Sequence, residues 1–251
     1  GSFIEDQDYF RLTGITRDVF LWSAPKVQIR DYFATTQIDY AAKSAKVKIS
    51  TDIQIAPKAK AAKDMTLTAE IWDNGKKVSE FSNRLDLSKS HNQEMELTVG
   101  NAKLWNAEQP NLYDLVLKLS QKGKTIDVRG SKLGIREVAV NEQGAITING
   151  KPIKIHGVNR HDFSTTNGRT VSKEEMERDI MLMKRLNINA VRTSHYPNNP
   201  YFYDLCDKHG IYVLAEANIE CHGNLSLSGN EKFAAPMVER NVNHVLWMRN
   251  H

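Results

Sequence analysis

The chain is poor in cysteine, with Cys206 and Cys221 alone among its 251 residues. Two cysteines exclude a small fold held together by a disulfide framework. Cys206 lies inside a predicted helix, where a small apolar side chain in the core is expected. The apolar fraction of 40% is ordinary for a globular protein, so an apolar core has to stabilise the fold.

Long apolar runs and concentrated charge are also missing. No segment is apolar enough to span a membrane. The net charge is only +4, and the densest basic run, Lys58 to Lys63, contains no aromatic residue for base stacking. These absences predict neither a membrane nor a nucleic-acid partner. No signal peptide is visible, and the opening Gly1-Ser2 is expected to be an artificial start inside a larger protein, which leaves cytoplasm and periplasm both open.

The middle of the sequence alternates apolar and polar residues from Val27 to about Val138. A period of two is typical of half-buried antiparallel strands. Turn signals at Asp73-Asn74-Gly75 and Lys122-Gly123 separate several of the strands. About seven short strands in about 110 residues predict an immunoglobulin-like sandwich without its disulfide. No residue in it suggests chemistry, and its expected role is to hold flanking domains at a fixed angle.

After a tight turn at Asn149-Gly150, the pattern changes to alternating strands and helices. This order predicts βα units with parallel strands. The expected strands are 153–158, 188–191 and 211–215, and the last helix is expected over 235–250.

Two predicted helices carry clear end signals. Ser172 and Glu175 form a capping-box pattern at the start of one. Asn199 and Pro200 suit the first turn of the next, and Gly210 suits its end.

Polar residues gather where each of the three predicted parallel strands ends. The carboxyl ends of parallel strands are where such folds place their chemistry. One cluster could be a structural network, but three in succession favour an active-site rim. The clusters are Asn159, Arg160, His161 and Asp162; Arg192, Thr193, Ser194 and His195; and Glu216, Asn218, Glu220 and His222.

Glu220 and His222 are also a candidate metal pair. Two residues apart on extended chain, their side chains point the same way. A hydrogen bond between carboxylate and imidazole explains the pair equally well. By ligand type alone, one Glu and one His suggest zinc or manganese.

Several motifs together resemble glycoside hydrolase family 2, in its β-galactosidase branch. The resemblance rests on residues 5–8 with 14–19, on 157–161, on 189–197 with Asp207 and Gly210, and on 216–223. It implies a multidomain β plus α/β fold, an immunoglobulin-like β-sandwich followed by the first βα units of a TIM barrel. The expected domains are 1–25, the tail of a sugar-binding β domain; 26–138, the sandwich; and 139–251, a truncated catalytic barrel.

The resemblance also implies roles for individual residues. His161 and His195 are expected to bind galactosyl hydroxyls and stabilise the transition state, and Arg192 to orient carboxylates. Asp8 is expected to reach the sugar and a sodium ion. Glu220 and His222 are expected to hold magnesium, with a third ligand after His251.

The implied reaction is retaining hydrolysis of terminal β-D-galactosyl residues, by a parent protein expected to be a homo-oligomer. Two carboxyl groups must flank the scissile bond, and in this branch both catalytic glutamates follow His251. The chain by itself is therefore predicted to be inactive.

Three alternatives remain open. The first is a β-glucuronidase of the same family. The second is a stand-alone carbohydrate-binding or scaffold module. The third is a TIM-barrel metallohydrolase holding one metal with His161, His195, Glu220 and His222.

Overall fold

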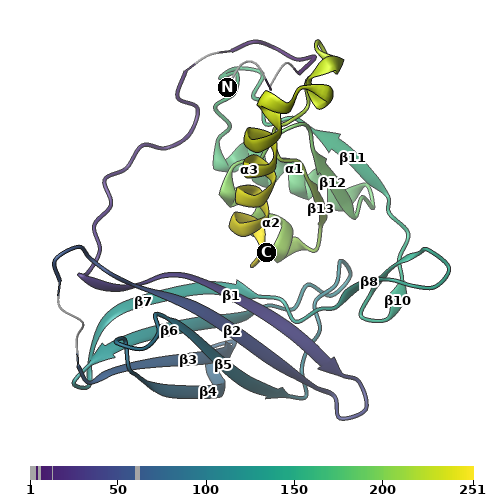
Figure 1. Cartoon of the computed structure of the whole chain (residues 1–251). Helices are drawn as coiled ribbons and strands as arrows, with labels where there is room; N and C mark the ends of the chain where they lie inside the picture. Colours follow the sequence, from purple (N-terminus) through teal and green to yellow (C-terminus); the bar gives the residue numbers. More distant parts are fainter. Residues whose placement is uncertain (1–3, 5–6, 13, 60–62) are drawn as a thin grey trace. The chain divides into compact units, whose positions relative to one another are not determined.

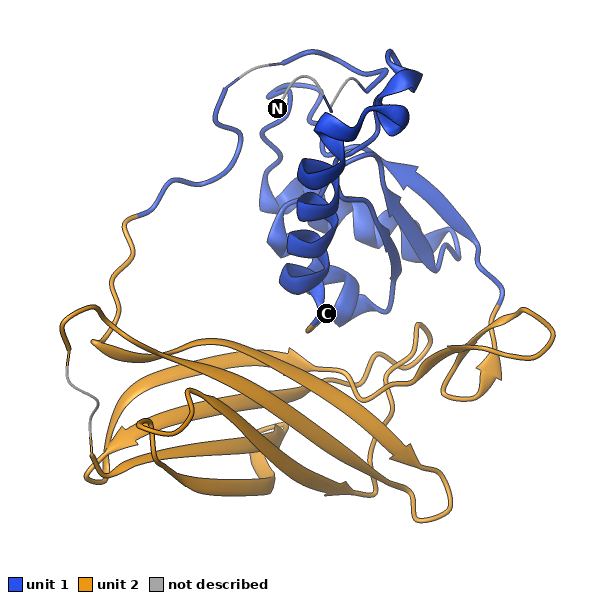
Figure 2. Ribbon diagram, in the orientation of Figure 1, with its two compact units in different colours: residues 1–20, 154–249, 251 blue, residues 21–153, 250 orange. Residues whose placement is uncertain are grey.

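The computed structural model describes residues 4, 7–12, 14–59 and 63–251. The chain forms two compact units (Figure 2): residues 21–153 with 250, and residues 1–20 with 154–249 and 251. The expectations for Gly1-Ser2, for Glu5 and Asp6 of the amino-terminal motif, and for residues 60–62 of the basic run lie outside the described residues.

Residues 21–153 contain an antiparallel β-sandwich of seven strands among the described residues (Figure 1). One sheet has the order β1-β2-β5 and the other β4-β3-β6-β7. Seven strands in two sheets confirm the predicted immunoglobulin-like sandwich. The strands are β1 (Val27–Asp39), β2 (Ser44–Ile55), β3 (Met65–Asp73), β4 (Lys76–Leu85), β5 (Asn92–Gly100), β6 (Tyr113–Gln121) and β7 (Lys124–Leu133).

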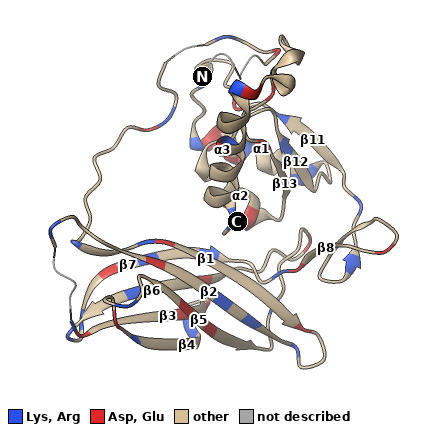
Figure 3. Ribbon diagram, in the orientation of Figure 1, with Lys and Arg blue, Asp and Glu red and all other residues tan. Residues whose placement is uncertain are grey.

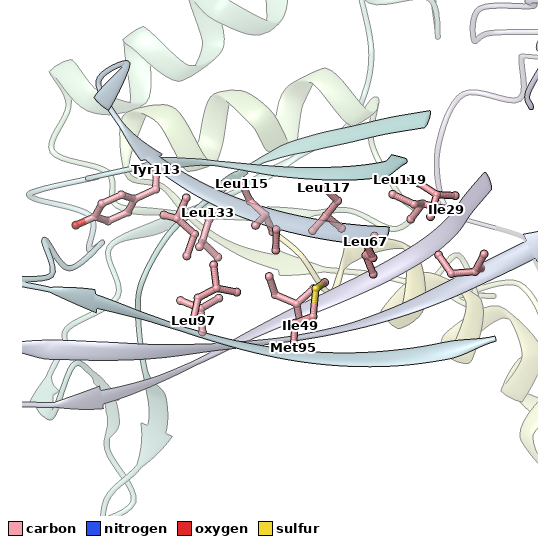
Figure 4. Packing of buried hydrophobic residues seen from close by; sticks show 14 of the residues in the cluster. Ile29, Ile49, Leu67, Met95, Leu97, Tyr113, Leu115, Leu117, Leu119 and Leu133 are labelled. Carbon is pink, nitrogen blue, oxygen red and sulfur yellow. The ribbon is translucent and has the colours of Figure 1, made fainter. Parts of the chain in front are cut away.

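The sandwich core is built from the inward side chains of both sheets. Figure 4 shows Ile49 and Leu97 of one sheet facing Leu67 and Leu117 of the other. Ile49, Leu67 and Leu117 are fully buried. Polar neighbours point outward, so the period-two pattern of the sequence is the pattern of burial.

Tight turns join neighbouring strands of the sandwich as their sequences predict. Asn74 and Gly75 link β3 to β4, and both have positive φ, at 49° and 81°. Lys122 and Gly123 link β6 to β7 in the same way. Positive φ at both central residues matches the twist of a two-residue hairpin.

A small antiparallel sheet of β8 (Val138–Val140), β9 (Ile146–Ile148) and β10 (Lys151–Pro152) follows the sandwich. The predicted turn at Asn149-Gly150 connects β9 to β10 with φ of 53° and 74°.

The second unit contains a parallel sheet of order β11-β12-β13. Helices connect these strands, which confirms the predicted βα units. An apolar layer from α1, α2 and β12 buries Ile180, Val191 and Phe202. The elements are β11 (Gly157–Arg160), α1 (Lys173–Arg185), β12 (Ala190–Thr193), α2 (Pro200–His209), β13 (Tyr212–Ala215), the 3-10 helix η1 (Leu225–Gly229) and α3 (Glu231–Met248).

The predicted boundaries of two strands and one helix were wrong by a few residues. β11 begins at Gly157 rather than at Ile153. At Gly157 the backbone lies so near β12 that a Cβ would be 3.2 Å from the Ala190 carbonyl oxygen. β12 ends at Thr193, so Arg192 belongs to the strand and does not follow it. α3 begins earlier than expected because the Asn230 side chain accepts a hydrogen bond from the Lys232 amide.

The predicted helix ends are confirmed. Ser172 and Glu175 form a reciprocal capping box at α1. Asn199 caps α2 through the Tyr201 amide, and Gly210 ends this helix with φ of 72°. A left-handed residue at that point favours glycine because it has no Cβ.

Figure 3 shows positions of Lys and Arg interspersed with positions of Asp and Glu along the strands of the sandwich. Lys46 pairs with Glu96, and Lys118 with Glu70. The Lys46–Glu96 pair is exposed, and such pairs stabilise a fold only slightly, whereas the carboxylate of Glu70 is buried. No helix of the described chain is both long and apolar enough to cross a membrane.

The sandwich core gives a direct stability test. Leu117→Ala removes a fully buried side chain and is expected to cost about 2–5 kcal/mol of unfolding free energy. Val128→Ala, at a position of β7 that is 49% exposed, is the control and should cost less than about 1 kcal/mol. Urea unfolding followed by circular dichroism measures both, and equal losses would contradict the assigned core.

Candidate active site at the ends of three parallel strands

The register of the parallel sheet places the carboxyl ends of the three strands side by side. Arg160 pairs with Thr193, and Thr193 pairs with Ala215, as the last residues of their strands. The residues that follow them, including His161 and Glu216, therefore emerge at one edge of the sheet. This is the edge where βα folds carry their chemistry.

At this edge, Glu216 ties Arg192 and His195 together. Its Oε2 lies 3.0 Å from Nδ1 of His195, and its Oε1 accepts a hydrogen bond from Nε of Arg192. Nη2 of Arg192 also lies 3.0 Å from Nδ1 of His195. Both carboxylate oxygens are thus occupied. The contact between Arg192 and Glu216 is the one that an orienting role for Arg192 requires. The role itself stays a prediction.

His161 lies next to this group. Its ring meets that of His195 edge to face, with centroids 5.4 Å apart, and its Nδ1 is 3.4 Å from the Tyr196 hydroxyl. Burial is the largest cause that lowers the pKa of His161, the electrostatic influence of His195, Arg169 and Arg192 lowers it further, and that of Glu216 opposes them. The imidazole is therefore neutral near pH 7 and can both accept and donate a hydrogen bond.

A buried ion pair supports the loop that carries His161. Nη1 of Arg160 lies 2.9 Å from Oδ1 of Asp162, and these side chains are only 6% and 1% exposed. Asn198 accepts from the same Nη1 at 2.6 Å, and the Phe202 ring lies 4.2 Å from the guanidinium. Because both neighbours of His161 in sequence are fixed in this way, the backbone of His161 has little freedom.

Glu220 and His222 lie near each other but outside this group of contacts. Oε1 of Glu220 is 3.9 Å from Nδ1 of His222, whose side chain is 72% exposed. Oε2 of Glu220 is buried without a hydrogen-bond partner. Within the described ranges, no three His, Cys, Asp or Glu residues lie close enough to hold a metal ion. A single site built from His161, His195, Glu220 and His222 is therefore contradicted, and a metal role for the pair alone stays a prediction.

Asp8 is exposed, on the segment that also carries Tyr9. Sequence reasoning did not identify Tyr9, whose ring stacks on His161 with centroids 3.8 Å apart. It also missed Arg169, whose guanidinium lies 4.4 Å from the Tyr196 ring. Both belong to segments without helical or strand periodicity, so no pattern in the sequence pointed to them.

Two family models match consecutive parts of the chain. Residues 27–136 match the model "Glycosyl hydrolases family 2", and residues 138–251 match "Glycosyl hydrolases family 2, TIM barrel domain". The three parallel strands are thus the start of a TIM barrel. The polar residues at their carboxyl ends lie at the face where TIM barrels carry their active sites. The chain belongs to glycoside hydrolase family 2.

Among curated proteins, the chain is similar to β-galactosidases. It is 37% identical to that of Priestia megaterium over 98% of the chain and 26% of the relative. It is 40% identical to that of Pseudoalteromonas haloplanktis over 98% of the chain and 25% of the relative. The chain thus spans about a quarter of the length of these relatives.

Solved structures agree on the fold. A family 2 member from Bacteroides cellulosilyticus superposes with a TM-score of 0.79 at 26% identity, over 91% of this chain and 30% of that one. A β-glucuronidase from Ruminococcus gnavus gives 0.76 at 22% identity, over 90% of this chain and 36% of that one. The predicted family and fold class are confirmed.

Stability should fall as the pH is lowered from about 7.5 to 5.5. Burial lowers the pKa of His161, His209 and His244, so the unfolded chain takes up protons in this range before the folded one does. The stability that comes with neutral histidines is present above the ordinary histidine pKa and is lost below it. Urea unfolding at several pH values measures the slope, and His209→Gln should reduce it. A constant free energy of unfolding over this range would contradict the prediction.

Proposed function

We propose that these residues belong to a retaining β-galactosidase that hydrolyses terminal β-D-galactosyl residues. The observation that carries the proposal is the joint position of His161 and His195 at the strand-end edge, with His195 held by Glu216 and Arg192. The similarity to β-galactosidases over nearly the whole chain supports galactose as the sugar.

The proposed roles follow from hydrogen-bond chemistry. When Nδ1 of His195 donates to Glu216, its Nε2 keeps a lone pair for a sugar hydroxyl. His161, neutral at the same edge, offers a second acceptor or donor. Such contacts accelerate the reaction where they are stronger in the transition state than in the bound substrate. Asp8 is proposed to add a carboxylate contact to the sugar and to take part in holding a sodium ion.

The chemical step is proposed to need carboxyl groups outside these 251 residues. A retaining enzyme places an acid/base and a nucleophile about 5–5.5 Å apart across the scissile bond. Both oxygens of Glu216 are engaged by Arg192 and His195, and Glu220 lies beside His222. Glu216 is therefore not free to act as one of that pair, Glu220 is proposed below to bind a metal ion instead, and the chain is proposed to supply the binding side of the site.

The chain should not release nitrophenol from a nitrophenyl β-galactoside above the buffer rate. Turnover by the purified chain that is lost in Glu220→Gln would refute the roles proposed for the two glutamates. A nitrophenyl β-glucuronide assayed in parallel separates the two sugars, and activity on it alone would replace galactose by glucuronate.

In the longer protein that contains the chain, His195→Ala should reduce kcat/KM by about 10²–10³-fold, as removal of one transition-state contact does. His91→Ala, at an exposed position in the sandwich, is the matched control and should keep full activity. Equal activity of the two variants would exclude His195 from the site.

Glu220 and His222 are proposed to supply two ligands to a magnesium ion. The unpartnered, buried Oε2 of Glu220 is the observation that suits a cation. When bound, the ion would add positive charge beside the reacting sugar.

Two protein ligands hold magnesium weakly because the ion keeps its water and prefers oxygen. Calorimetry with the chain should therefore give a dissociation constant of about 1 mM or weaker, and Glu220→Gln should remove the remaining heat. Manganese, which accepts imidazole more readily, should bind more tightly than magnesium. A micromolar affinity for magnesium would show that the ligand set is already complete.

A further inference from the structure

The amino-terminal residues 7–12 and 14–20 form an N-terminal arm that contacts the loops following all three parallel strands. Nε2 of Gln7 donates to Oδ1 of Asn218 at 2.6 Å, after β13. Nη2 of Arg17 lies 2.8 Å from the buried carboxylate of Asp162, after β11, and donates to the Pro197 carbonyl oxygen, after β12. The arm is thus fixed at both ends on the edge that carries the two histidines.

Between these attachments, Phe10 and Leu12 each touch a neighbouring loop, although these residues are 62% and 44% exposed. Cδ1 of Leu12 lies 2.8 Å from the position that a Cβ of Gly168 would take, so the arm touches this loop through an apolar side chain. The Phe10 ring stacks on Phe163 with centroids 5.2 Å apart. These contacts fix the position of Tyr9 along the edge.

Tyr9 lies flat against His161. Their ring centroids are 3.8 Å apart and their planes differ by 1°. The Phe163 ring meets Tyr9 edge to face at 5.7 Å, which supports the tyrosine ring from a second side. One face of the imidazole is therefore covered by an aromatic ring that is itself held in place.

Two further contacts restrict the orientation of the His161 ring. His195 meets it edge to face and the Tyr196 hydroxyl approaches its Nδ1. We propose that Tyr9 is a positioning residue, which fixes the plane of the His161 imidazole and shields one of its faces from water. The inference deepens the proposed function. It rests on that function only for the expected effect of Tyr9 on sugar binding.

Electrostatics give the stack a measurable consequence. The charged and titratable groups around His161 are Tyr9 from the arm, Arg169 from the loop before α1, Arg192 and His195 from the second strand end with Tyr196, and Glu216 from the third. Burial is the largest cause of the lowered His161 pKa. An aromatic face attracts a cation and acts in the opposite direction, so removal of the ring tests which effect dominates.

The test is a proton titration of His161 by NMR in the chain labelled at histidine, with its signals assigned by their loss in His161→Gln. Tyr9→Ala and Tyr9→Leu should raise the pKa of His161 by about half a pH unit or more, because water reaches the open face. Tyr9→Phe keeps the stack and should leave the pKa unchanged.

Phe20→Ala is the matched control, because it removes an arm ring that is 79% exposed. It should leave the His161 titration as it is. Tyr9→Leu keeps an apolar anchor without a ring face, so it separates the stack from mere attachment of the arm. An unchanged or lowered pKa in both Tyr9→Ala and Tyr9→Leu would overturn the inference, and so would an equal rise in Phe20→Ala.

The sugar consequence is measured on the same samples with isopropyl β-D-thiogalactoside, which is not hydrolysed. Its addition should shift the His161 and His195 signals of the unaltered chain, and Tyr9→Ala should bind it about 5–10-fold more weakly, which corresponds to about 1–1.4 kcal/mol. A lack of any shift in the unaltered chain counts against the proposed function, whereas equal binding by Tyr9→Ala and the unaltered chain counts against the role of Tyr9.

Discussion

The parallel pairing of β11, β12 and β13 is the constraint on which the site depends. Hydrogen bonds between these strands align Arg160, Thr193 and Ala215 as neighbours. Because successive side chains of a strand alternate between its faces, a shift of one residue in the pairing would move every strand-end side chain to the other face. The contacts among His161, His195 and Glu216 exist only in this register.

Buried charge makes this edge rigid and also vulnerable. Arg160 and Asp162 are nearly inaccessible to water, and removing one partner of such a pair costs about 3–5 kcal/mol because the other charge is left buried. Partial burial also lowers the pKa of the neighbouring His161. Loss of contact with water thus affects both groups, the ion pair far more completely than the imidazole.

The two units of the chain differ in how their residues are used. In the sandwich, buried positions such as Leu67 and Leu117 are apolar, and the period-two pattern leaves most of the charge on the outside, with Glu70 and Asp127 as buried exceptions. In the βα unit, a similar apolar layer under α1 and α2 stabilises a polar rim. The first arrangement suits a support and the second a site, as expected in a family whose catalytic chemistry lies in the barrel.

Local patterns in the sequence determined the architecture. The alternation in residues 27–138, the glycine turns, the capping box at Ser172 and the helix end at Gly210 depend on neighbours in sequence, and the structure confirms each of them. Only tertiary structure decided where β11 begins, that Glu216 joins Arg192 to His195, and that Tyr9 covers His161. Tyr9 and His161 are far apart in the chain and share no periodicity. Their contact follows from close packing in three dimensions, which no local pattern records.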